Sequence, residues 1–141
     1  MKKILIIEDD PKIAKALALR LKSAGYEATM ASDALTGLAA AVKLKPDLLL
    51  LDISIPAGNG FMVAERVQCL ISRPTPIIFL TASKQSAFKN RARELGAAAF
   101  FEKPYQPEQL LAAVSKILGD PSLPPNPWAI PPGRDSSSRM L

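Results

Sequence analysis

The sequence predicts an α/β protein in which a parallel five-stranded sheet lies between two layers of helices, the doubly wound arrangement. Five short apolar runs alternate with segments whose apolar residues recur every three to four positions, as Ile13, Leu17 and Leu21 do. Some runs are apolar throughout, and residues 48–51 are four consecutive leucines. Such runs suit central strands that helices cover on both faces. The alternation therefore predicts successive strand–helix units joined by right-handed crossovers.

The expected strands cover residues 4–7, 27–31, 48–51, 77–80 and 98–101. The second is the weakest, because it mixes polar and apolar residues without a clear period. The other four are short apolar segments of the length that strands usually have.

Capping residues mark where the helices begin and end. Asp10 before Pro11 indicates the start of the first helix, because an aspartate N-cap and a proline at the first helical position both favour initiation. Gly25 and Gly96 follow the expected ends of the first and fourth helices. The fifth helix is expected over about residues 106–118.

We expect residues 1–119 to form one domain and residues 120–141 to be a Pro/Ser-rich tail or linker, disordered rather than regularly structured. The chain has 141 residues, of which 48% are hydrophobic, enough for one domain with a core. The apolar run at 4–7 is too short for a signal sequence or a membrane span. The chain has a single cysteine, Cys69, which cannot form an internal disulfide. These features predict a cytoplasmic protein with no membrane partner.

The charge balance is modestly basic, with 18 Lys and Arg against 13 Asp and Glu. The basic residues are scattered along the sequence and no aromatic-rich RNA motif accompanies them, so we do not expect nucleic acid as a partner of this chain alone. The sequence contains no histidine. Mechanisms that need a histidine base, metal ligand or phosphohistidine within this chain are therefore excluded.

Polar residues follow four of the expected strands. Glu8 and Asp9 follow the first, Asp52 the third, Thr81 the fourth, and Lys103 comes after the fifth. Ligands of open parallel sheets bind beyond the carboxyl ends of the strands, so these side chains are expected to converge at one edge. Taken singly, each has a simpler explanation as a helix cap, a turn residue or a solvated lysine. Their joint placement favours a functional site.

The clustered acids predict a magnesium site. Two carboxylates about 4 Å apart repel each other by about 4 kcal/mol at an effective dielectric constant near 20, and a divalent cation removes that penalty. Mg²⁺ favours one or two carboxylates together with phosphate oxygens and water. We expect Asp9 and Asp52 as direct ligands, Glu8 acting through water, and the backbone carbonyl of Ser54 as a further ligand.

The same residues predict phosphoryl transfer, which depends on positioning and on neutralising charge. Asp52 is the expected nucleophile and would form an acyl phosphate. Mg²⁺ would hold one phosphoryl oxygen, Lys103 a second, and the Thr81 hydroxyl with the Ala82 amide a third. We expect no enzyme acting on separate substrates, but a phosphoacceptor that catalyses its own phosphorylation and dephosphorylation.

The sequence resembles the receiver domains of response regulators in two-component signalling, of the chemotaxis-regulator type. The resemblance covers about residues 2–118, and its matching segments are residues 4–10, 51–56 with Gly60, 80–82, and 103–104. It implies a flavodoxin-like fold with strand order 2-1-3-4-5. It also implies that the donor is the phosphohistidine of a sensor histidine kinase or of a phosphotransfer protein.

Three further expectations follow from this resemblance. The peptide bond between Lys103 and Pro104 should be cis. Phe100 stands where the family has its switch aromatic and would move together with Thr81, although an ordinary core aromatic explains it as well. The fourth helix, fifth strand and fifth helix would form the output face. The basic residues along the fourth helix either select an acidic partner or are simply solvent-exposed.

Other functions fit the sequence less well. An aspartyl phosphatase needs an acid two residues after its nucleophile, where Ser54 stands. A nucleotide-binding domain needs a glycine-rich turn after the first strand, where acids stand instead. A degenerate receiver, which acts as an interaction module without phosphorylation, remains the alternative. Asn59 also departs from the family's usual sequence, in which an acid is common at this position.

The output partner is not readable from the sequence. The chain either acts by docking to an unknown output protein or belongs to a longer protein whose effector domain is missing. A homodimer through the fourth and fifth helices is left open.

Overall fold

The structure, a computed structural model, describes residues 1–119. Five strands alternate with five helices along the chain. In order, they are β1 (Lys3–Ile7), α1 (Pro11–Ser23), β2 (Glu27–Ala31), α2 (Ala34–Leu44), β3 (Leu48–Asp52), α3 (Gly60–Leu70), β4 (Ile77–Thr81), α4 (Ser86–Glu94), β5 (Ala99–Glu102) and α5 (Pro107–Leu118). The predicted α/β class is confirmed. The predicted tail, residues 120–141, lies outside the described residues.

All five strands are parallel and lie in the order β2-β1-β3-β4-β5, as the family resemblance implied. The chain therefore moves outward to β2 and then crosses β1 to continue on its other side. The order of connection reverses between β1 and β3, which is where α/β sheets of this kind place their ligands.

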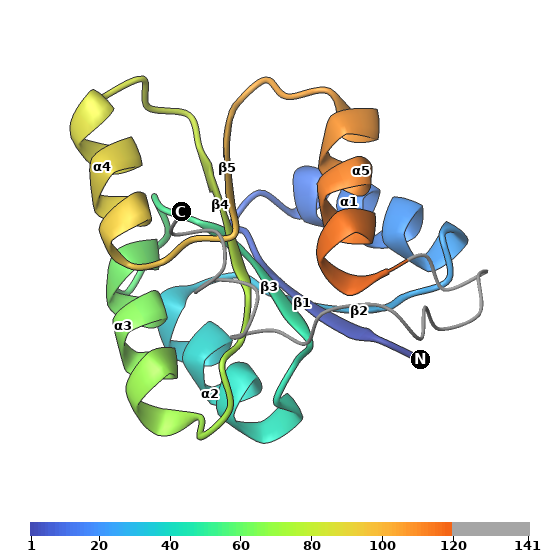
Figure 1. Ribbon diagram of the computed structural model, residues 1–141, viewed down its shortest axis with the longest axis horizontal. Helices are drawn as coiled ribbons and strands as arrows, with labels where there is room; N and C mark the ends of the chain where they lie inside the picture. The colour runs from blue at the N-terminus through green and yellow to red at the C-terminus, as the bar shows by residue number, and fades with distance from the viewer. Residues whose placement is uncertain (120–141) are drawn as a thin grey trace, which may run out of the picture.

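Helices cover both faces of the sheet, with α1 and α5 on one face and α2, α3 and α4 on the other (Figure 1). Each face has its own apolar core. Alternate residues of the central strands supply them, so Leu49 and Leu51 of β3 join the core beneath α2 to α4, whereas Leu48 and Leu50 join the core beneath α1 and α5. The result is the predicted three-layer sandwich.

The predicted boundaries hold to within one residue. Asp10 caps α1, and its side chain accepts a hydrogen bond from the Lys12 N–H at 2.9 Å. Gly25 and Gly96 have positive φ angles of 99° and 77° just after α1 and α4. The Lys103–Pro104 peptide bond is cis, as expected. No helix within residues 1–119 has the length and apolar character needed to cross a membrane.

Candidate functional site

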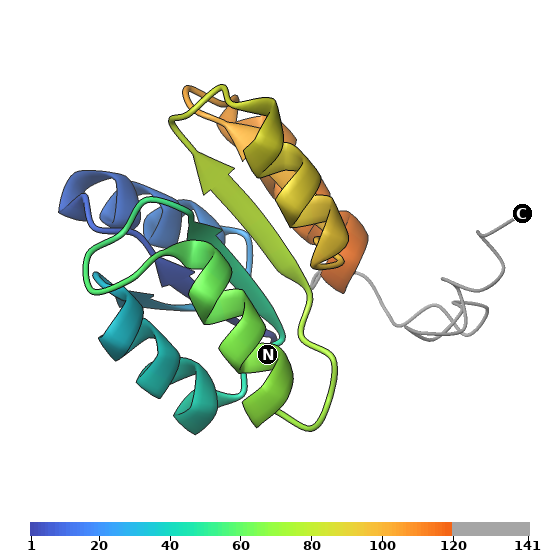
Figure 2. The same cartoon turned by 90° about the vertical axis from the view of Figure 1, so that its left-hand side faces the viewer.

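The carboxyl edge of the sheet brings the expected site residues together. In Figure 2 the strand arrowheads point to the upper left, which is the end of the molecule where these residues lie. Glu8 and Asp9 follow β1, Asp52 ends β3 and Thr81 ends β4, while Lys103 follows β5. The paired register Asp52↔Leu80 and Thr81↔Glu102 shows that the strands remain in the ladder up to these residues.

Three carboxylates form the centre of this edge. One oxygen from each of Glu8, Asp9 and Asp52 lies within 4.8 Å of the others. Glu8 and Asp52 are buried, with 2% and 3% of their surface exposed, whereas Asp9 is exposed. The expected cluster of acids is therefore present, with two members shielded from water and one at its mouth.

Lys103 reaches into the cluster. Its ammonium donates hydrogen bonds to Asp52 Oδ2 at 2.7 Å and to Glu8 Oε1 at 2.5 Å. Lys103 is expected to hold a phosphoryl oxygen, and a divalent cation is expected to relieve the repulsion between the acids. In this structure the Lys103 ammonium itself neutralises part of the charge of Glu8 and Asp52.

Burial and pairing shift the proton affinities of this centre. Burial in the protein raises the pKa of Glu8 from 4.5 to about 7, although hydrogen bonds from Lys103 and the Asp10 amide act in the opposite direction. Burial would lower the pKa of Lys103, but its hydrogen bonds to Asp52 and Glu8 outweigh it, and the pKa of Lys103 is raised. Lys103 therefore stays charged at neutral pH, while Glu8 exchanges its proton near neutrality.

Backbone amides fix the carboxylates in place. The Ser54 N–H donates to Asp52 Oδ1 at 3.0 Å, which leaves Oδ2 to face Lys103. The Asp10 N–H donates to Glu8 Oε2 at 3.2 Å. Glu8 and Asp52 are therefore each held on one oxygen by the backbone and on the other by the lysine.

Thr81 is fully buried at the end of β4. Its hydroxyl accepts a hydrogen bond from the Ser83 N–H at 3.0 Å, so the backbone after the strand holds the side chain. The Lys103 N–H donates to the Thr81 carbonyl at 2.7 Å. A shift of either residue therefore acts on the other through the main chain.

Phe100 lies in β5 and is half-buried against the core beneath α2 to α4. This position agrees both with a core aromatic and with a side chain that moves. The basic residues of α4 remain largely on the outside of the molecule, although Arg91 pairs with Glu65 of α3.

The turn between β3 and α3 is built from residues whose roles the sequence alone did not reveal. The side chain of Asn59 accepts a hydrogen bond from the Met62 N–H at 2.9 Å and so caps α3. The Gly60 N–H donates to the Ile53 carbonyl at 2.8 Å. A Cβ atom on Gly60 would stand 2.6 Å from the Asp52 carbonyl oxygen, so the approach of α3 to β3 requires glycine. An asparagine before a glycine was the available signal for this cap.

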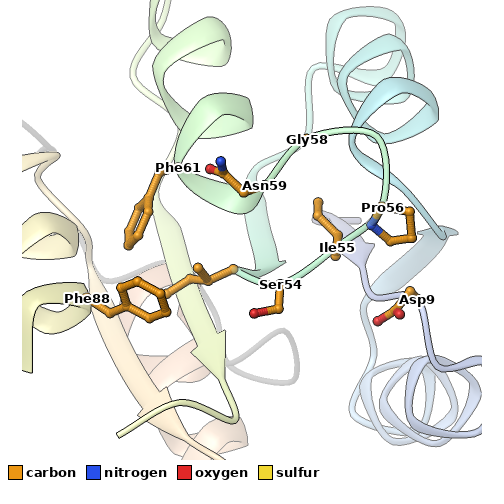
Figure 3. A pocket seen from close by; sticks show the side chains of 9 residues that line it. Asp9, Ser54, Ile55, Pro56, Gly58, Asn59, Phe61 and Phe88 are labelled. Atoms are coloured by element: carbon orange, nitrogen blue, oxygen red, sulfur yellow. The ribbon is translucent and has the colours of Figure 1, made fainter. Parts of the chain in front are cut away.

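A cleft of about 450 Å³ opens beside the acids, with Asp9 and Ser54 toward one side (Figure 3). Its other wall is apolar and consists of Phe61 from α3 and Phe88 from α4. These two rings meet edge to face, with centroids 5.6 Å apart. No sequence pattern indicated this wall, because the two phenylalanines belong to different helices.

The donor set fits a hard divalent cation. Three carboxylates supply anionic oxygens, one of them exposed, and the neighbouring cleft leaves room for water or phosphate oxygens. Soft ligands are missing from this group, which among residues 1–119 consists of acids alone. The acidic pocket is thus chemically suited to Mg²⁺.

The comparisons with known proteins agree with this geometry. The sequence matches the family described as the response regulator receiver domain over residues 4–115. It is 38% identical over 119 residues to the DNA-binding dual master transcriptional regulator RpaA of Synechocystis, a match that covers 84% of this chain and 49% of that protein. It is 36% identical over 118 residues to the phosphate regulon transcriptional regulatory protein PhoB of Pseudomonas aeruginosa, a match that covers 83% of this chain and 52% of that protein. The chain thus spans about half the length of these relatives.

A solved structure supports the same assignment. The CheY-like response regulator receiver domain protein of Methanospirillum hungatei has a TM-score of 0.77 at 31% identity, with 82% of this chain and 92% of that chain covered. Sequence, fold and acidic edge therefore lead to one conclusion. The chain belongs to the receiver domain family of two-component response regulators.

Proposed function

We propose that Asp52 accepts a phosphoryl group, with Mg²⁺ assistance, from the phosphohistidine of a sensor histidine kinase or of a phosphotransfer protein. The observation that carries this proposal is the joint position of Glu8, Asp9 and Asp52, whose oxygens lie within 4.8 Å of one another, with the Lys103 ammonium 2.7 Å from Asp52. This arrangement holds a carboxylate nucleophile beside both a metal-binding group and a fixed cation.

Asp9, Asp52 and the Ser54 carbonyl are the proposed ligands of Mg²⁺, and Glu8 acts through water. Bound there, the ion supplies charge neutralisation for the transferred oxygens. The Ser54 amide holds Asp52 Oδ1 at 3.0 Å and the Lys103 ammonium holds Oδ2 at 2.7 Å, and Oδ2 is the oxygen proposed to attack phosphorus as Lys103 moves to the phosphoryl group. The oxygen–phosphorus bond forms there as the bond from phosphorus to the donor nitrogen breaks, and the imidazole leaves with its electron pair.

Lys103 then has a second role. Its ammonium holds Asp52 Oδ2 before transfer, and we assign it to a phosphoryl oxygen afterwards. The Thr81 hydroxyl and the Ala82 amide are assigned as hydrogen-bond donors to another oxygen, and the Thr81 oxygen can still accept from the Ser83 amide. Hydrolysis of the acyl phosphate at the same site returns Asp52 to its starting state.

The output is proposed to pass through the face made by α4, β5 and α5. Movement of Thr81 and Lys103 acts on β5 through their 2.7 Å main-chain hydrogen bond, and Phe100 of β5 is the proposed switch side chain. The partner on this face is an output protein or an effector domain, and self-association through it is the homodimer alternative. We place the reaction in the cytoplasm, whose reducing conditions suit the exposed free thiol of Cys69.

Intact-mass measurement after incubation with Mg²⁺ and acetyl phosphate tests the proposal. We expect one added phosphoryl group in the wild type and in Asp10→Asn, where asparagine still caps α1. We expect none in Asp52→Asn. EDTA should prevent the adduct in the wild type and in Asp10→Asn.

An adduct retained by Asp52→Asn would assign the reaction to another acid. If the wild type takes up no phosphoryl group while circular dichroism shows it folded, the chain is a phosphorylation-independent interaction module.

A further inference from the structure

The end of the sheet opposite the acids is rich in cations. We call six of them the basic end: Lys2, Lys3, Lys22, Lys43, Lys45 and Arg73. They come from the start of β1, the carboxyl ends of α1 and α2, and the loop after α3. All six residues are exposed. In Figure 2 these segments lie at the end of the sheet away from the strand arrowheads.

Hydrogen bonds hold the segments of the basic end together. The Asp47 N–H donates to the Lys3 carbonyl at 2.7 Å. The Arg73 guanidinium donates to the Lys45 carbonyl at 2.6 Å. Cations that are scattered along the sequence are thus joined in space, which the composition alone did not show.

Few acids balance these cations. Glu27 and Asp47 lie among them, and Asp47 pairs with Arg73 at 3.3 Å. Within the part of the chain that the structure describes, the five lysines of the basic end form no ion pair. Their charge is therefore available to a ligand.

The opposite end has the reverse charge. Seven acids and only three lysines occur at the carboxyl ends of the strands and in the segments that follow them, residues 8–12, 32–33, 52–59, 82–86 and 102–108. The molecule is thus charged with opposite sign at its two ends, along the direction of the strands. Such a field orients an anionic partner toward the basic end and away from the phosphorylation site.

Helix stabilisation does not account for all of these cations. Basic residues in the last turn of a helix interact favourably with its dipole, which explains Lys22 and Lys43. Lys2 and Lys3 instead precede or begin a strand. Lys45 has a φ angle of 49°, the left-handed conformation that favours glycine at a helix end. A lysine there costs stability, and residues in such conformations cluster at functional positions.

We propose that the basic end binds the phosphate backbone of double-stranded DNA without sequence preference. A duplex carries one negative charge per about 1.7 Å of its axis, so an array of exposed lysines meets many phosphates at once. No aromatic residue among residues 1–119 is exposed. The described surface therefore offers no ring on which single-stranded bases stack and none that anchors at a membrane interface, which favours duplex DNA over these alternatives.

Fluorescence anisotropy of the full chain with a labelled duplex of about 20 base pairs tests the proposal. We expect binding at about 50 mM NaCl that weakens steeply toward about 200 mM, with log K falling by about 0.9 per phosphate contact against log salt. The triple variant Lys2→Glu, Lys22→Glu, Lys43→Glu should bind at least about tenfold more weakly and give a shallower salt dependence.

The matched control is the triple variant Lys12→Glu, Lys15→Glu, Lys89→Glu, which changes the net charge equally at exposed positions outside the basic end. It should lose less than about threefold in affinity. Equal losses in both triple variants would show that net charge alone attracts DNA, and absence of wild-type binding at low salt would overturn the proposal. Binding to vesicles of anionic phospholipid without binding to DNA would assign the surface to membranes instead.

Lys45→Gly gives an independent test, because the two consequences of this substitution have opposite directions. Glycine suits the positive φ angle, so the melting temperature should rise. The lost cation should weaken DNA binding about two- to threefold and reduce the salt slope by about 0.9. A more stable variant with unchanged DNA affinity and slope would remove Lys45 from the proposed surface.

Discussion

The β3–α3 unit and the β5–α5 unit each carry a charged residue of the site, but they are built differently. All five residues of β3 are buried, and Asp52 is its last residue. In β5 the first three residues are half-buried and Glu102 is exposed, and Lys103 follows the strand. The acid therefore stands on one of the two fully buried strands of the sheet, and the cation follows a strand that is only partly buried.

The position of each strand in the sheet explains the difference. β3 lies between β1 and β4, whereas β5 is an edge strand that pairs only with β4. Moving β3 would disturb two ladders and both cores, and moving β5 disturbs much less. A receiver built in this way keeps the proposed nucleophile, Asp52, fixed and leaves the neighbouring cation, Lys103, on the part that can adjust.

Truncation of a core residue in each strand tests this contrast most strongly. Leu50→Ala in β3 should lower the free energy of unfolding by about 4 kcal/mol, because the leucine is fully buried and leaves a cavity. Phe101→Ala in β5 should cost about 2 kcal/mol despite the larger side chain, because its ring is partly exposed. Urea unfolding followed by circular dichroism measures both. Equal losses would show that β5 is as firmly packed as β3.

A pair of glycines gives the next largest contrast. Gly60→Ala should cost about 3 kcal/mol and reduce phosphorylation, because its Cβ would press on the Asp52 carbonyl and the Ile53 backbone. Gly96→Ala, just before the β5 segment, meets no atom within 4 Å but has a positive φ angle. It should cost only about 1 kcal/mol and leave phosphorylation unchanged. Loss of phosphorylation in both variants would break the link between the β3–α3 contact and the site.

Glu8 joins the two units, and its pKa of about 7 predicts a pH dependence of stability in magnesium-free buffer. The folded state holds this proton more tightly than the unfolded chain. The free energy of unfolding of the wild type, measured relative to that of Glu8→Gln, should therefore be greatest below about pH 4.5. It should fall as the pH rises to about 7 and stay constant at higher pH. The total change is at most about 3 kcal/mol. A pH-independent difference in urea unfolding would mean that Lys103 keeps Glu8 ionised throughout.

The helix caps provide the smallest contrast. Asn59→Ala removes the side-chain bond to the Met62 amide and should cost about 1 kcal/mol. Gln106 stands at the same position of α5 but makes no capping hydrogen bond, so Gln106→Ala should change stability by less than about 0.5 kcal/mol. Thermal melts of the two variants measure the difference. A larger effect at Gln106 would reverse the expected order of the two units.

Much of this architecture was predictable because local signals and the overall fold agree. The four leucines at 48–51 predicted a strand covered on both faces, and β3 is that strand. It also includes Asp52, because the ladder with Leu80 continues through the charged residue that ends the apolar run. The range predicted for β5 was one residue too early. The three alanines at residues 97–99 show no alternation of polar and apolar residues that would mark where the strand begins. The Ala98 N–H donates a hydrogen bond to the Ile77 carbonyl just before the strand.

The site was predictable in its composition but not in its contacts. Strand ends placed the acids and Lys103 at one edge, since parallel strands share a direction. Lys103 binds one particular oxygen of Glu8 and one of Asp52, and this choice depends on side-chain geometry that the spacing of residues in the sequence does not reveal. The same holds for the wall of Phe61 and Phe88, which comes from the packing of two helices.

The ion pair between Glu8 and Lys103 joins residues 95 positions apart. A chain still emerging from the ribosome therefore has the three acids of the site well before it has the cation that pairs with two of them. Under the proposed function, the site is completed late in synthesis, once β5 has joined the sheet. A protein truncated ahead of residue 103 would retain Asp52 and yet lack the partner that helps hold it in place.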